Sequence, residues 1–91
     1  MLRLTWRPRA SARLANFINY IADRDPAAAE KLRASIYRSI DHAREFPEAY
    51  RRGRRPGTRE IVAHRNYIVI YRVAGDELDV LTVIHARQKY P

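Results

Sequence analysis

The chain contains no cysteine, so it can form neither a disulfide bond nor a thiolate metal site. No apolar run comes near the roughly 18 residues that a membrane-spanning helix needs. The start of the chain also lacks the long apolar segment of a signal peptide. We therefore expect a cytoplasmic protein that does not associate with a membrane.

Sequence motifs of the common catalytic and cofactor sites are missing as well. There is no glycine-rich phosphate-binding loop, no dinucleotide-binding fingerprint, no HExxH pair and no CxxC pair. The acidic residues fall mainly where helix surfaces and turns are expected, and no pair of carboxylates is placed for acid-base chemistry. The sequence predicts no metal and no cofactor.

Positive charge is what the chain has in excess. Its 91 residues include 18 lysines and arginines but 10 aspartates and glutamates, which gives a formal net charge of +8. This length predicts one domain, residues 1–91. The charge indicates an anionic partner, either nucleic acid or an acidic protein and less often a membrane surface, while a basic domain without such a partner stays an alternative.

Residues 67–73 are the stretch around which the rest is organised. They form an unbroken run of β-branched and aromatic side chains with a single charge, that of Arg72. Such a run predicts a strand that is buried on both faces and lies in the middle of a sheet.

Two amphipathic helices are predicted before this strand. Apolar residues recur at helical spacing from 9 to about 23 and again from 26 to about 45. Asp25 and Pro26 supply an N-cap and a first helical residue for the second helix. Because so few residues separate them, the helices should form an antiparallel hairpin.

The remaining segments predict four strands, at residues 2–6, 58–64, 67–73 and 78–85. The last three are joined by short turns and should form an antiparallel meander with the strand 67–73 in its centre. The predicted fold class is α+β, in the order β-α-α-β-β-β, with the helix hairpin on one face of a small antiparallel sheet. No element remains for the other face, so we expect it to be apolar, open and rimmed by arginines.

Two histidines end neighbouring strands of this meander. His64 and His85 should lie at the same end of the sheet, near Arg65 and Arg87. Histidines can act as acid and base in phosphodiester cleavage while arginines neutralise charge. The alternative is that each histidine caps backbone groups at a turn. His42, on a helix, is expected to be solvated.

Several other residues allow two interpretations. The loop 46–57 holds four arginines that either bind phosphates or an acidic antagonist or belong to a solvated flexible loop. Glu60 is either a site carboxylate or the partner of a nearby arginine. Tyr67, Tyr71 and Tyr90 could stack on bases, although tyrosines at the spacing of Tyr67 and Tyr71 are more often part of a core.

The C-terminal third resembles a known family. The segments GTREIVAH (57–64), NYIVIYRV (66–73) and VIHARQKYP (83–91), together with the helix start DPAA (25–28), are similar to the RelE/ParE toxin superfamily. HAR (85–87) and the ending YP (90–91) look closer to the ParE branch. The resemblance spans nearly the whole chain and implies the β-α-α-β-β-β fold and the toxin half of a type II toxin-antitoxin module.

The resemblance also implies partners and two alternative activities. A cognate, acidic antitoxin from an adjacent gene would silence the toxin. Toxin and antitoxin would also be expected to form higher-order assemblies. ParE-like members inhibit DNA gyrase, whereas RelE-like members cleave mRNA on the ribosome. Arg87 matches an arginine of the nucleases, but Glu60 and Val62 stand where these carry lysines.

The site residues follow from these two activities. A nuclease would use His64, His85 and Arg87 as catalytic residues. The residues expected to bind the target or the antitoxin are Arg51, Arg52, Arg54, Arg55, Arg59, Arg65, Arg72 and Tyr90.

Overall fold

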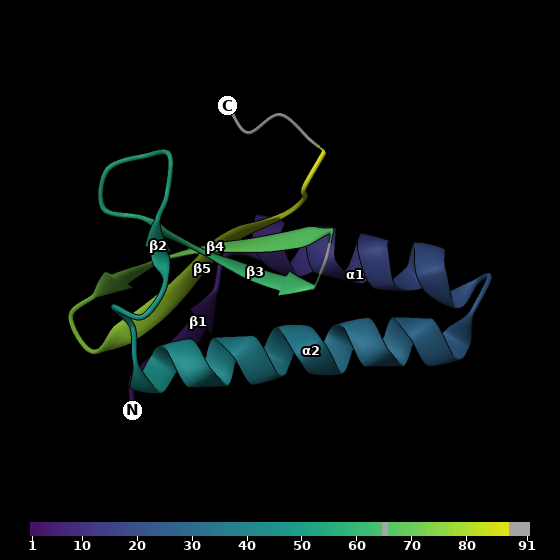
Figure 1. The fold of residues 1–91 in the computed structure, drawn as a ribbon, viewed down its shortest axis with the longest axis horizontal. Helices are drawn as coiled ribbons and strands as arrows, with labels where there is room; N and C mark the ends of the chain where they lie inside the picture. Colours follow the sequence, from purple (N-terminus) through teal and green to yellow (C-terminus); the bar gives the residue numbers. More distant parts are fainter. Residues whose placement is uncertain (65, 88–91) are drawn as a thin grey trace.

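The computed structural model describes residues 1–64 and 66–87, in which two helices pack on a mixed sheet (Figure 1). The elements are β1 (Arg3–Trp6), α1 (Pro8–Ala22), α2 (Pro26–Glu45), β2 (Arg51–Arg52), β3 (Arg59–His64), β4 (Tyr67–Ala74) and β5 (Glu77–His85). The predicted fold class, with the order β-α-α-β-β-β, is confirmed, and β2 is an addition to it. No helix within the described ranges is long and apolar enough to cross a membrane.

The helix hairpin forms as predicted. Pro8 and Pro26 each open a helix, where the missing N–H of proline removes no intrahelical hydrogen bond. The Asp25 carboxylate accepts a hydrogen bond from the Ala28 N–H at 3.1 Å and so caps α2. Figure 1 shows α1 and α2 antiparallel and joined by a short turn.

The strand order in the sheet is β1-β5-β4-β3-β2, so β4 lies in the middle. The β3-β4-β5 meander is antiparallel, as predicted. The sheet as a whole is not antiparallel, however, because β1 pairs in parallel with β5, with Leu4 opposite Leu78. Parallel neighbours require a long connection, and the intervening helices and strands provide it.

The segment that we expected to be only a loop contains the short strand β2. Arg51 pairs with Glu60 and Arg52 with Arg59, which adds a fifth strand beside β3. Two residues are too few to show an alternating pattern in the sequence. Their pairing is decided by the closure of the β2–β3 hairpin, where the Gly53 N–H donates to the Thr58 carbonyl at 2.8 Å.

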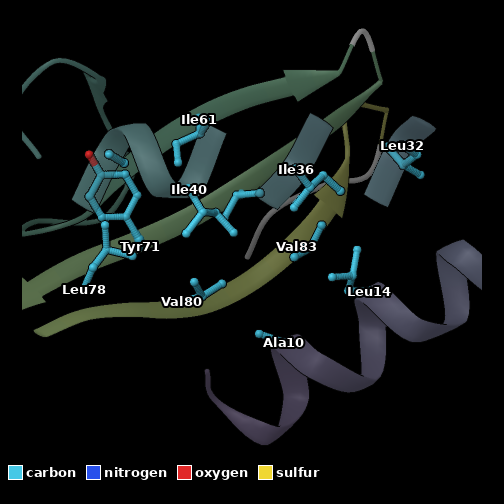
Figure 2. Close-up of a cluster of buried hydrophobic side chains, with 12 residues drawn as sticks. Ala10, Leu14, Leu32, Ile36, Ile40, Ile61, Tyr71, Leu78, Val80 and Val83 are labelled. Carbon is cyan, nitrogen blue, oxygen red and sulfur yellow. The ribbon is translucent and has the colours of Figure 1, made fainter. Parts of the chain in front are cut away.

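The main core lies between the helix hairpin and the sheet. Figure 2 shows side chains of both helices pointing toward side chains of β3, β4 and β5. Tyr71 of β4 is among the largest of these residues and is completely buried. The cluster comprises Ala10, Leu14, Leu32, Ile36, Ile40, Ala43, Ile61, Val69, Tyr71, Leu78, Val80 and Val83.

The opposite face of the sheet is not the open apolar surface that we expected. Ile68, Ile70 and Ile84 form a second buried cluster there and are 4%, 0% and 3% exposed. Leu81 packs against them. Val62 of β3, at 54%, is an exposed apolar residue beside this cluster. The expectation failed because it counted helices only, whereas neighbouring side chains of the sheet itself, such as Leu81, also bury residues of this face.

Replacing Ile70 with alanine tests the importance of this second cluster. Ile70 is completely buried, so its truncation should lower the free energy of unfolding by roughly 2–5 kcal/mol. Val62→Ala, on the neighbouring strand and largely exposed, is the control and should cost less than about 1 kcal/mol. Urea titration measures both values, and equal losses would show that the second face is open.

Candidate functional site

We call the sheet surface opposite the helices the front face. Cross-strand pairing places Glu60 of β3 beside Ile70 of β4, and Arg72 of β4 beside Asp79 of β5. Thr5 of β1 continues the second row, next to Asp79. Charged side chains therefore lie on the front face close to the buried isoleucines.

Asp79 forms ion pairs with two arginines, Arg7 and Arg72. Its carboxylate accepts hydrogen bonds from Arg7 Nε at 2.9 Å and from Thr5 Oγ1 at 3.1 Å. Arg72 Nε lies 4.0 Å from the same carboxylate. The Asp79 side chain is 14% exposed, whereas those of Arg7 and Arg72 are about half exposed. Asp79 thus holds both guanidinium groups in place at the surface.

Glu60 plays the same part for two other arginines. Its Oε1 accepts from Arg51 Nε at 3.1 Å and lies 3.0 Å from Arg51 Nη2. Arg54 Nε approaches Oε2 at 3.6 Å. Glu60 is 4% exposed, and within the described residues its Oε2 accepts no hydrogen bond. The ion-pair interpretation of Glu60 is confirmed.

Arg51 and Arg54 belong to residues 51–58, which we call the arginine loop. Besides the bond from Gly53 to Thr58, the buried Thr58 hydroxyl donates to the Arg55 carbonyl at 2.7 Å. A Cβ at Gly53 would collide with Thr58 Oγ1, and Gly57 has a φ of 80°, so both positions favour glycine. Hydrogen bonds and close packing therefore give the loop a defined shape.

The Arg59 side chain forms its hydrogen bonds within the chain. Its Nη1 donates to the carbonyl of Tyr50 at 2.7 Å and reaches that of Glu48 at 3.5 Å. This predicted binding residue therefore braces the segment that leads into β2. A hollow of about 240 Å³ opens beside it, lined among others by Glu48 and Arg72.

Aromatic residues brace the same segment from the core. The buried Tyr71 hydroxyl donates to the Pro47 carbonyl at 2.6 Å. Tyr50 Oη lies 2.8 Å from His42 Nδ1, and the rings of Tyr50 and Tyr71 meet edge to face. His42 is exposed but has a partner, which the sequence did not reveal because Tyr50 lies beyond the end of the helix.

The two predicted histidines lie at the other end of β3, as the meander implied. His64 and His85 flank Tyr67 in register. His85 Nδ1 accepts a hydrogen bond from the Arg87 N–H at 3.2 Å, and its ring meets that of Tyr67 edge to face. This is the turn-capping alternative for His85. His64 and Arg87 are exposed.

The predicted site residues thus fall into two places. Arg51, Arg52, Arg54, Arg55 and Arg59 lie in or beside the arginine loop, with Arg72 across the hollow from it. His64 stands five residues along β3 from Arg59, about 16 Å away given a rise of roughly 3.3 Å per residue, and His85 and Arg87 lie at that same end of the sheet. Arg65 and Tyr90 lie outside the described residues. Over the described part of the chain, no group of three metal-ligating side chains occurs.

Comparison with known proteins identifies similar sequences. A sequence model described as the ParE toxin of the type II toxin-antitoxin system parDE matches residues 4–90. The candidate toxin Y4kP of Sinorhizobium fredii is 41% identical over 90 residues, which cover 98% of this chain and 93% of that protein. Toxin RelE2 of Caulobacter vibrioides is 31% identical over 88 residues, covering 94% and 97%.

Solved structures share the fold. A chain from the chromosomal ParDE system of P. aeruginosa has a TM-score of 0.82 at 23% identity, covering 96% of this chain and 98% of that one. A YoeB/ParE toxin from Agrobacterium tumefaciens has a TM-score of 0.66 at 17% identity, covering 92% and 98%. The arrangement of two helices on the sheet is therefore common to this chain and both solved structures.

The burial of the Tyr71 hydroxyl predicts how the stability of the protein depends on pH. Burial raises the pKa of Tyr71 from 10.0 to about 12, so the unfolded chain releases this proton at lower pH than the folded protein. The stabilisation is complete below pH 10 and is lost as the pH rises toward 12. Tyr71→Phe has no hydroxyl to ionise, so its free energy of unfolding should decline less over this range.

Urea unfolding at a series of pH values measures this difference. Burial also raises the pKa of Tyr50 and Tyr67, but both proteins retain these residues. The difference between the two curves therefore isolates Tyr71. Parallel curves for the wild type and the variant would contradict the prediction.

Proposed function

The chain belongs to the ParE toxins of type II toxin-antitoxin systems, and from this premise we propose that it inhibits growth by binding an essential protein in the cytoplasm. The expected target is DNA gyrase, the target that the ParE resemblance implies. The proposed activity is inhibition through binding rather than catalysis. A cognate antitoxin silences the toxin in the proposed system.

The observation that carries the binding proposal is the chemistry of β3 on the front face. Glu60 and Val62 occupy the positions where, by the family resemblance, the nucleases carry lysines. Glu60 is a carboxylate held between Arg51 and Arg54, and Val62 is an exposed apolar side chain. Neither side chain can neutralise the charge of a phosphate during cleavage. An exposed valine beside half-exposed arginines suits contact with a protein.

Two observations support an antitoxin as the second partner. The net charge of +8 favours an acidic protein, and a domain of this size gains stability from a partner that binds only its folded form. One solved relative comes from a structure described as a ParDE system. We extend the proposal to higher-order toxin-antitoxin assemblies.

A RelE-like, ribosome-dependent mRNA endoribonuclease is the second candidate. His64 and His85 flank Tyr67, and the exposed Arg87 follows, so groups for acid-base chemistry and charge neutralisation share one end of the sheet. A relative named Toxin RelE2 matches 94% of the chain. Against this candidate, His85 Nδ1 already accepts a hydrogen bond from Arg87.

Induced expression separates the two candidates. For a gyrase inhibitor, DNA replication should stop first, purified protein should inhibit supercoiling by gyrase, and mRNA should stay intact. Early loss of translation with cleaved transcripts would instead support the nuclease and reject gyrase. Normal growth after induction without the antitoxin would contradict both candidates.

Arg87 allows a mutational test at the end of β5. Its side chain is exposed, so Arg87→Ala should leave the midpoint of urea unfolding nearly unchanged. Toxicity should fall, since Arg87 follows His85 at the end of the sheet and matches an arginine that the family resemblance makes functional. Arg38→Ala, an exposed arginine on α2, is the matched control and should stay toxic. Unfolding of Arg87→Ala would mean that this residue is structural.

A further inference from the structure

The arginine loop is the most strongly charged segment of the described surface. Its eight residues hold Arg51, Arg52, Arg54 and Arg55 and no acidic residue. The side chains of Arg51 and Arg54 are 57% and 48% exposed, and Arg52 and Arg55 are exposed as well. In Figure 1 the loop projects from the sheet on the side away from α2. The core does not account for these four arginines, since none of them is buried.

The shape of the loop is set before any partner arrives. Gly53, Gly57 and Thr58 fix its backbone, as described above. The nearly buried Glu60 carboxylate then orients the guanidinium groups of Arg51 and Arg54 from below. Ordering an arginine side chain on binding costs conformational entropy. Because Arg51 and Arg54 are already ordered by Glu60, less of this entropy is lost when a partner binds. Preorganised arginines on an exposed loop are a feature of binding surfaces.

The charges around the loop indicate which anion fits. Carboxylates adjoin the arginines: Glu60 pairs with Arg51 and Arg54, and Glu48 lines the hollow that Gly57 of the loop borders. A phosphodiester backbone is negative at every unit and meets repulsion at Glu48. A polypeptide can place carboxylates opposite the arginines and hydrogen-bond donors opposite the glutamate. The mixed pattern therefore favours a protein over a nucleic acid.

We propose that the arginine loop, residues 51–58, is a docking site for a carboxylate-bearing segment of the antitoxin. This inference depends on the proposed function in that the partner is the antitoxin. It goes further by assigning the contact to one loop and to carboxylate groups. Planar guanidinium forks bind carboxylates through two parallel hydrogen bonds, which gives the contact direction as well as charge.

Binding of two labelled probes at low salt tests the docking site. One is a decapeptide with blocked termini in which glutamate alternates with serine, and the other is a hexaribonucleotide with the same number of negative charges. Arg52→Ala combined with Arg55→Ala removes two loop charges. Arg9→Ala combined with Arg38→Ala removes two charges from the exposed sides of the helices and is the matched control. Fluorescence anisotropy measures each affinity.

We expect the wild type to bind the peptide more tightly than the oligonucleotide. The loop variant should lose up to about tenfold in peptide affinity, the equivalent of two exposed ion pairs. The helix control should lose less than about twofold, because its net charge is the same but the loop is intact. Circular dichroism should show that both variants are folded.

Three results would overturn the docking site. These are an equal loss in both variants, tighter binding of the oligonucleotide than of the peptide, and no peptide binding by the wild type. None of these results would contradict the proposed inhibition of gyrase, because growth arrest and gyrase inhibition are measured without the antitoxin. Conversely, a failure to inhibit gyrase would leave the comparison between the two double variants unchanged.

Discussion

Burial of β4 on both faces is the constraint on which this structure depends. Val69 and Tyr71 point into the core beneath the helices, and Ile70 points the other way, yet all three are completely buried. A strand of this kind is stable only in the middle of a sheet that is covered on both sides. The helix hairpin covers one side. On the other side, Ile68 and Ile84 join Ile70 in a smaller cluster.

The second cluster links stability to the arrangement of charge. Glu60 pairs with Ile70 across β3 and β4, and it is buried along with the isoleucine. A buried carboxylate needs compensating charge, which Arg51 and Arg54 supply. The fold thereby fixes the arginine side chains at its surface. Asp79 does the same for Arg7 and Arg72. The binding surface that we propose is thus a consequence of how the sheet buries its acidic residues.

Several features could be predicted from the sequence because their signals are local. Helical periodicity and Pro26 after Asp25 marked the helix hairpin. The run 67–73 marked the central strand, and short turns forced the meander that brings His64 and His85 to one end. Features that depend on distant segments were missed. Among them are the strand pairing of Arg51 in β2 with Glu60 in β3, the parallel pairing of β1 with β5, and the contact between His42 and Tyr50.

The candidate site divides in the same way. Composition and motifs by themselves determined that the chain is basic, that it has no cysteine chemistry, and which family it resembles, because these depend only on residue identity and order. Only the tertiary structure decided that the buried Glu60 carboxylate holds Arg51 and Arg54 and that the second sheet face is closed. The physical reason is that burial and ion pairing depend on distances between segments, and sequence spacing does not specify those distances.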